Sequence, residues 1–238
     1  MTIPLCFAGA VCRQILERRG IYVAAQITSI HNIKDKPLSP TAVTKEELLA
    51  VRNRRFPVNN PAQGRKMLAD IQNAAAGGES LGGTIACYAV NVPAGIGSPI
   101  FEGLENSIAQ LVFGISGVRG LEFGDGFRTA KMTGSQCNDP FYVDDHGHVR
   151  TQTNHHGGIL GGISSGMPIC FDVAVKPTAS IQKPQETVDY SAMTNEVLQS
   201  AEQVHPCLRS KQPCRSRLSR ICWIIRILFE SAAFRPNE

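Results

Sequence analysis

TGSQCNDPFYVDDHGHVRTQTNHHGGILGGISSGMPICFDVAVKPTASI, residues 133–181, is the most distinctive stretch of the chain. Five glycines fall within the ten positions of GGILGGISSG, residues 157–166. Glycine loses more conformational freedom on folding than any other residue, so such a run in an ordered segment needs a reason. The usual reasons are turns with positive φ and a backbone that lies directly against a ligand. Lys176–Ser180 (KPTAS) then offers a cation, a rigid turn and two hydroxyl groups, which suit a phosphate or another anion.

Two interpretations of this stretch stay open on the residues alone. In the first, GGILGG is a buried hairpin and KPTAS is a surface turn, because glycine-rich segments are common in turns. In the second, both segments contact one anionic cofactor. This second interpretation predicts that Gly157–Ile163 and Lys176–Ser180 lie close together on one concave face.

The order of residues in this stretch resembles the chorismate synthase family. The resemblance rests on NDPFY (138–142), TNHHGGILGGISSGMPI (153–169) and KPTASI (176–181). It includes VPAGIGSPIFEGLENSIAQLVFGISGVRGLEFGDGF (92–127) and extends from about Ile3 to about Asp189. Three blocks in this order and at this spacing are a specific signal for the family.

The resemblance implies a carbon–oxygen lyase of the shikimate pathway, which serves aromatic amino acid biosynthesis. The family converts 5-enolpyruvylshikimate 3-phosphate to chorismate and phosphate, and needs reduced FMN although no net redox change occurs. Such chemistry needs acid/base groups near an electron-rich flavin and cations on the phosphate. The family enzyme is a homotetramer. The resemblance also implies a cytoplasmic flavoprotein with neither a nucleic-acid nor a membrane partner.

Position by position, the resemblance assigns FMN contacts to eight residues of this chain. They are Ser116, Gly117, Gly161, Lys176, Pro177, Thr178, Ala179 and Ser180. The family's two acid/base histidines have no counterpart in this sequence, and Gln203 and His205 replace its late arginine and aspartate. The resemblance therefore assigns no catalytic residue and predicts a chain that is inactive alone. The alternative is a non-catalytic flavin-binding remnant or a decayed gene fragment.

Both ends of the chain depart from the family pattern. The first expected helix opens the sequence where the family has a long preceding region, which predicts that the N-terminal third of the family domain is missing. We therefore expect a chorismate-synthase-like domain over 1–200 and a divergent basic tail over 201–238. Residues 208–238 hold seven Lys/Arg and two Asp/Glu, a charge of +5 within a chain of +4. This abrupt change predicts a shifted reading frame and a poorly packed tail with Trp223 only partly covered.

Apolar periodicity predicts an α+β fold. Helices are expected over 5–19, 44–53, 63–76 and 104–114, and strands over 21–30, 83–92 and 118–127. These elements lack the regular spacing of βαβ repeats, and no G-x-G-x-x-G sequence opens a helix. The resemblance likewise implies sheets packed on a helical layer, here incomplete. An apolar content of 42% and a charged content of 18% describe an ordinary globular protein.

Histidines and a cysteine in the central stretch suggest a rival metal site. The candidate ligands are Cys137, His146, His148, His155 and His156. Their spacing matches no familiar zinc pattern, so no metal is expected. We expect Asp144–His148 to form a hairpin tip, and His155 and His156 to support the glycine segment through hydrogen bonds.

Lone carboxylates and thiols have ordinary interpretations. Asp125 and Asp139 stand beside glycines or turns, so turn formation is favoured over an acid/base role. The eight cysteines form no C-x-x-C pair and follow no signal peptide, which predicts reduced thiols. No apolar run approaches the roughly 18 residues of a membrane span.

Overall fold

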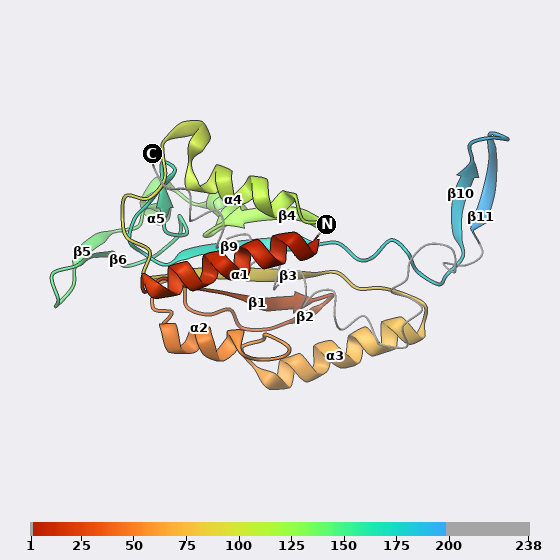
Figure 1. Cartoon of the computed structure of the whole chain (residues 1–238), viewed down its shortest axis with the longest axis horizontal. Coiled ribbons are helices and arrows are strands. Elements are labelled where there is room, and N and C mark those ends of the chain that lie inside the picture. The colour runs from red at the N-terminus through yellow and green to blue at the C-terminus, as the bar shows by residue number, and fades with distance from the viewer. Residues whose placement is uncertain (1, 199–238) are drawn as a thin grey trace.

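The computed structural model describes residues 2–198 (Figure 1). In chain order the elements are α1 (Thr2–Arg18), β1 (Tyr22–Ile30), β2 (Ile33–Lys34), α2 (Lys45–Arg52), α3 (Pro61–Ala76), β3 (Gly83–Val90), η1 (Ile100–Glu102), α4 (Leu104–Phe113), β4 (Val118–Phe123), η2 (Gly126–Lys131), α5 (Gly134–Cys137), β5 (Phe141–Val143), β6 (Val149–Thr151), β7 (Ile159–Leu160), β8 (Ile163–Ser164), β9 (Ile169–Val175), β10 (Gln185–Asp189) and β11 (Thr194–Leu198). The η elements are short 3-10 helices. The tail predicted over 201–238 lies outside the described residues.

The helices and long strands expected from periodicity are present, and local sequence explains several of their ends. α2 begins with the expected cap, because the Thr44 side chain accepts the Glu47 N–H and the Glu47 carboxylate accepts the Thr44 N–H at 3.0 Å. β4 ends at Phe123 rather than at the expected residue 127. Gly124 and Gly126 have φ of 55° and 48°, so the chain turns there into η2.

A five-stranded antiparallel sheet in the order β2-β1-β3-β9-β4 forms the body of the molecule. β9 pairs with β3 along one edge and with β4 along the other, and Phe171 stands opposite both Cys87 and Phe123. Side chains alternate along a strand, so Phe171, Val173 and Val175 point to one face and Asp172 and Ala174 to the other. This architecture confirms the predicted α+β class.

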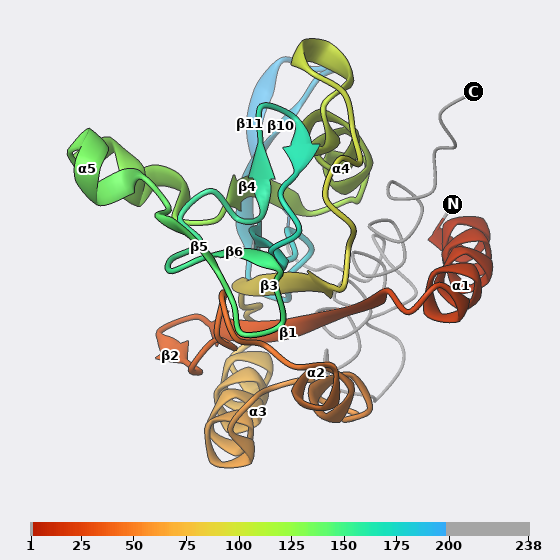
Figure 2. The ribbon, with the colours of Figure 1, turned by 90° about the vertical axis from the view of Figure 1, so that its left-hand side faces the viewer.

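Each face of the sheet is covered by different elements. Figure 2 shows α1 and α4 on one side of the sheet, with α5 and the β5–β6 ribbon on the other. Leu16 of α1 and Ile108 of α4 pack with Phe171 in the larger core cluster. Leu48 of α2 packs with Tyr88 of β3 in a second cluster on the opposite face. The strands are therefore held between two apolar layers.

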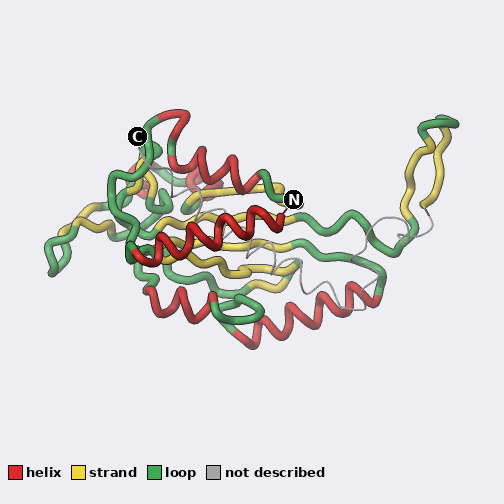
Figure 3. Tube along the Cα trace, in the orientation of Figure 1, coloured by secondary structure: helices red, strands yellow, loops and turns green. Residues whose placement is uncertain are grey.

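Two antiparallel ribbons extend from the body. β10–β11 projects beyond one end of the sheet, and β5–β6 projects at the other end (Figure 3). The tip of β5–β6 is the hairpin expected over Asp144–His148, and the Asp144 carboxylate accepts the N–H groups of His146 and His148 at 2.9 and 2.8 Å. Within residues 2–198, no helix is long and apolar enough to cross a membrane.

Asp172 and Glu122 form a cross-strand carboxylate pair. They stand directly opposite each other in the β9–β4 register. Burial, followed by the charge of Glu122, raises the pKa of Asp172 to about 6, and Arg128 partly opposes this rise. The sheet therefore holds a carboxyl group that loses its proton only near neutral pH.

The two glycines of the β7–β8 turn differ in how closely the chain packs against them. Gly161 and Gly162 have φ of 60° and 86°, which fits the two turn residues of a type I′ hairpin. A Cβ at Gly162 would lie 2.3 Å from the Ser98 carbonyl oxygen, whereas one at Gly161 would meet nothing within 4 Å. Gly161→Ala should therefore cost about 1 kcal/mol of unfolding free energy, the penalty of a left-handed residue. Gly162→Ala should cost clearly more, and equal losses in urea unfolding would contradict this packing.

The carboxylate pair predicts how stability changes with pH. Folding raises the pKa of Asp172 above the ordinary value of 3.8. The contribution of Asp172 to the free energy of unfolding is therefore complete below pH 3.8 and is lost as pH rises through about 6. Asp172→Asn should match the parent near about pH 4 and exceed it by on the order of 1–2 kcal/mol near about pH 8. Urea unfolding at both pH values measures this, with Asp145→Asn at the exposed hairpin tip as the control. A variant that is less stable than the parent at the higher pH would refute the prediction.

Candidate functional site

Two of the segments predicted to bind the cofactor, Ser116–Gly117 and Lys176–Ser180, join at the end of β9. The Lys176 N–H donates to the Gly117 carbonyl oxygen at 2.9 Å, which joins Ser116–Gly117 to Lys176–Ser180. Gly117 has a φ of 99°, and this turn lets the chain leave α4 and enter β4 beside Val175. Ser116, Lys176 and Pro177 are exposed. This end of the sheet therefore offers a cation, hydroxyl groups and open backbone.

The glycine segment lies at the other end of β9. The Cys170 N–H donates to the Gly157 carbonyl oxygen at 3.0 Å, and the Leu104 N–H at the start of α4 donates to Gly162 at 2.8 Å. Cys170 and Lys176 are six residues apart on one extended strand, which spans about 20 Å. The prediction that Gly157–Ile163 and Lys176–Ser180 lie close together is therefore wrong. Both α4 and β9 separate them, and one ligand contacts both segments only if it extends along these elements.

Most glycines of this segment serve backbone packing. A Cβ at Gly157 would lie 2.5 Å from both the Cys170 carbonyl oxygen and the Gly124 nitrogen. Ile159 is buried in the core and begins the β7–β8 hairpin, so the expectation that GGILGG forms a hairpin is confirmed. Gly161 differs because it is exposed and has no neighbour near the Cβ position. Its backbone is open to a ligand.

Asp139 holds the chain that leads into the glycine segment. Its buried carboxylate accepts the N–H groups of His155 and His156 at 2.8 and 3.2 Å, the His156 ring at 2.8 Å and the Thr153 hydroxyl at 2.7 Å. Burial alone would raise the pKa of Asp139, but these hydrogen bonds together lower it below the ordinary value. The Asp139 carboxylate therefore holds the distant turn at His155 and His156, which leads into the glycine segment, rather than a turn of its own.

Asp125 does not follow the same pattern. Its carboxylate contacts the His155 Nδ1 at 2.8 Å and accepts a hydrogen bond from Arg128. Within the described chain no backbone N–H reaches this carboxylate, and the Phe127 N–H that an aspartate turn would use donates to Glu122 at 3.1 Å. Asp125 lies in a turn, as predicted, and its carbonyl oxygen accepts the Arg128 N–H at 2.9 Å, but its carboxylate takes no part in that turn. Nothing in the local sequence pairs Asp125 with His155, because their contact depends on how two loops meet beside β9.

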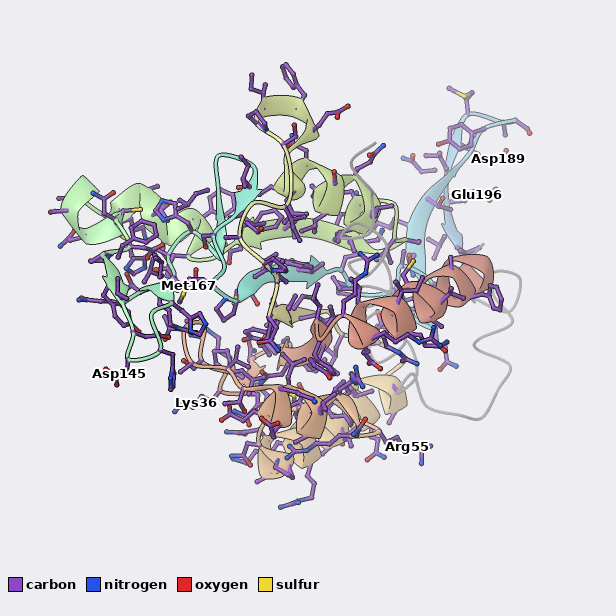
Figure 4. The ribbon with its side chains drawn as sticks, turned by 60° about the vertical axis from the view of Figure 1, so that its left-hand side comes forward. Lys36, Arg55, Asp145, Met167, Asp189 and Glu196 are labelled. Carbon is purple, nitrogen blue, oxygen red and sulfur yellow. The ribbon has the colours of Figure 1, made fainter. Side chains whose placement is uncertain are left out.

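The other histidines and the cysteines do not gather into a site. In the part of the chain that the structure describes, no three His, Cys, Asp or Glu side chains are placed to hold a metal ion. Figure 4 shows Asp145 at the tip of the β5–β6 ribbon, well away from Asp189 and Glu196 on β10–β11. Cys12, Cys137 and Cys170 are free thiols.

Comparison with known proteins identifies one family. Residues 1–213 match the family model described as chorismate synthase. A chorismate synthase of Korarchaeum cryptofilum is 42% identical over 212 residues, which cover 87% of this chain and 56% of that protein. That of Thermococcus gammatolerans is 42% identical and covers 89% and 57%. A crystal structure of chorismate synthase has a TM-score of 0.75 at 25% identity, over 98% of this chain and 61% of that one.

The sequence match and the structural match agree in extent. The chain spans a little more than half the length of these relatives. The antiparallel sheet, the glycine hairpin and the Lys176 segment all lie within the matched residues. The chain belongs to the chorismate synthase family.

Proposed function

We propose that this chain takes part in the conversion of 5-enolpyruvylshikimate 3-phosphate to chorismate and phosphate with reduced FMN. Membership of the family over residues 1–213 supports the reaction class, a cytoplasmic carbon–oxygen lyase of the shikimate pathway. The observation that carries the proposal is the junction of Gly117 with Lys176, which joins the two segments that hold seven of the eight expected cofactor contacts at one end of the sheet. The family's homotetramer is proposed with it.

The residues at this junction fit an FMN molecule. The Lys176 side chain forms no ion pair with any residue in the range 2–198, so its charge is available to a phosphate. The Ser80 hydroxyl donates to the Thr178 carbonyl oxygen at 2.7 Å and fixes the segment against the body. The hydroxyls of Thr178 and Ser180 and the backbone of Pro177 and Ala179 complete the proposed contacts. When bound, reduced FMN supplies the electron-rich ring that the elimination needs.

Gly161 belongs to the proposed site only through an extended ligand. α4 separates the glycine hairpin from Gly117 by its ten residues, a length of about 15 Å. The ring and the phosphate of FMN lie at opposite ends of that molecule. We therefore propose that FMN lies along α4 and β9, with one end at Lys176 and the other near Gly161.

A second candidate function is flavin binding without turnover. The elimination needs acid/base groups next to the bound molecules. Among the described residues, the imidazole–carboxylate pairs His155–Asp125 and His156–Asp139 lie at the glycine end of β9, and His148–Asp144 lies at the tip of the β5–β6 ribbon. A fourth pair, His31–Asp70 at 3.3 Å, lies toward the Lys176 end, because the His31 N–H donates to the Gly82 carbonyl oxygen beside Pro177. Gln203 and His205 stand where the family has an arginine and an aspartate, which favours a chain that holds the cofactor but does not complete the reaction alone.

We expect the purified chain to show no measurable formation of chorismate, even with reduced FMN supplied. Loss of one well-placed acid/base group costs on the order of a hundred- to ten-thousand-fold in rate, and Gln203 and His205 replace the family's late arginine and aspartate. The assay follows chorismate by absorbance under anaerobic conditions. The chorismate synthase of Thermococcus gammatolerans serves as the positive control. A rate near that of the control would contradict the second candidate and favour catalysis by the chain itself.

Binding of reduced FMN is measured separately, by equilibrium dialysis. Lys176→Gln should weaken binding about tenfold or more, because a charge-assisted contact to phosphate is lost. Lys183→Gln is the matched control, since Lys183 lies nearby in sequence but pairs with Glu79 at 2.8 Å. Equal affinities of the two variants would remove Lys176 from the proposed site.

A further inference from the structure

The carboxylate of Asp125 has a different set of partners from the turn aspartates of this chain. Asp144 accepts two backbone N–H groups of its own turn, and Asp139 accepts two from the turn at His155 and His156. Asp125 accepts hydrogen bonds only from side chains among the described residues, and its turn is made by Gly124 and Gly126. The turn has no need of this carboxylate, which leaves its contact with His155 to be explained.

His155 is held in one orientation by this contact. Its Nδ1 lies 2.8 Å from Asp125 Oδ2, and the Asp125 N–H donates to the His155 carbonyl oxygen at 2.8 Å. A carboxylate accepts a hydrogen bond and does not donate one, so Nδ1 carries the proton in the neutral ring. Nε2 is then the nitrogen that can take up or release a proton. Acid/base pairs of histidine and aspartate in enzymes share this arrangement.

The surroundings keep the pair sheltered and its charge balanced. The side chains of His155 and Asp125 are 21% and 16% exposed, so the ring is shielded but reaches solvent. Arg128 binds the second carboxylate oxygen of Asp125, and Glu122 and Asp172 lie on the neighbouring strands. His156 faces Asp139 instead, whose carboxylate is fully occupied by the turn. A proton on His155 Nε2 would therefore be compensated by Asp125.

We propose that His155 exchanges a proton through Nε2 with a molecule bound at the glycine end of β9, and that Asp125 positions its ring. The proton passes from the bound molecule to Nε2, stays on the ring as imidazolium opposite the Asp125 carboxylate, and returns to water. Gly161, whose backbone is open, belongs to the same glycine segment. This inference rests on the proposed function, which needs an acid/base group at the far end of an extended cofactor.

Carbethoxylation by diethyl pyrocarbonate tests this proposal without requiring turnover. The reagent attacks the unprotonated nitrogen of a neutral imidazole, and peptide mass spectrometry gives the rate at each histidine of the full chain. We expect His155 to react faster than His148, although the His148 side chain is 74% exposed. Asp125→Asn should abolish this advantage, because the ring is no longer held with Nε2 free. Asp144→Asn, which alters the partner of His148, is the matched control and should leave the His155 rate unchanged.

A His155 rate no faster than that of His148, or one that survives Asp125→Asn, would overturn the proposal. If that variant fails to fold, NMR of the ring nitrogens in the unmodified chain decides instead. The Nδ1–H tautomer of neutral His155 is expected, and the Nε2–H tautomer would refute the pair. Reduced FMN together with 5-enolpyruvylshikimate 3-phosphate should protect His155 but not His148. Fast but unprotected modification would contradict binding of these molecules at the glycine end, and with it the proposed function, while the positioning of His155 by Asp125 would stand.

Discussion

The pairing of β9 along both of its edges is the constraint on which the rest of the structure depends. The strand hydrogen-bonds to β3 and β4, so every residue from Ile169 to Val175 is fixed in register. Phe171 and its neighbours on one face fill the larger core, and Asp172 on the other face meets Glu122. The glycine segment is attached to one end of the strand and Lys176 to the other. The length of β9 thus sets the distance between the two parts of the candidate site.

Local sequence was sufficient to predict the features that depend on a few neighbouring residues. The capping box at Thr44 and the hairpin tip at Asp144–His148 are examples. Contacts between distant segments could not be predicted in this way. The separation of Gly161 from Lys176 follows from how β9 and α4 run through the fold, and the Asp125–His155 pair joins residues that are 30 positions apart. No periodicity or spacing rule connects such positions.

The resemblance to a family predicted which residues contact the cofactor, but it did not indicate how far apart those residues lie in the fold. It assigned cofactor contacts to eight positions, of which seven belong to the two segments joined at Gly117 and Lys176 and one stands at the opposite end of the sheet. A ligand that extends along α4 and β9 reconciles this arrangement with a single cofactor. In that proposal the far end of the ligand lies at the end of β9 where His155 contacts Asp125.

Amide hydrogen exchange resolved by residue tests the central role of β9 most directly. If the strand is the inner member of the sheet, the amides of Phe171 and Val173 should be among the slowest to exchange and should open together with those of Ile85 and Cys87 on β3. The exposed ribbon β10–β11 should exchange much faster. Exchange of the β9 amides as fast as those of the ribbon, or independently of β3, would contradict the account.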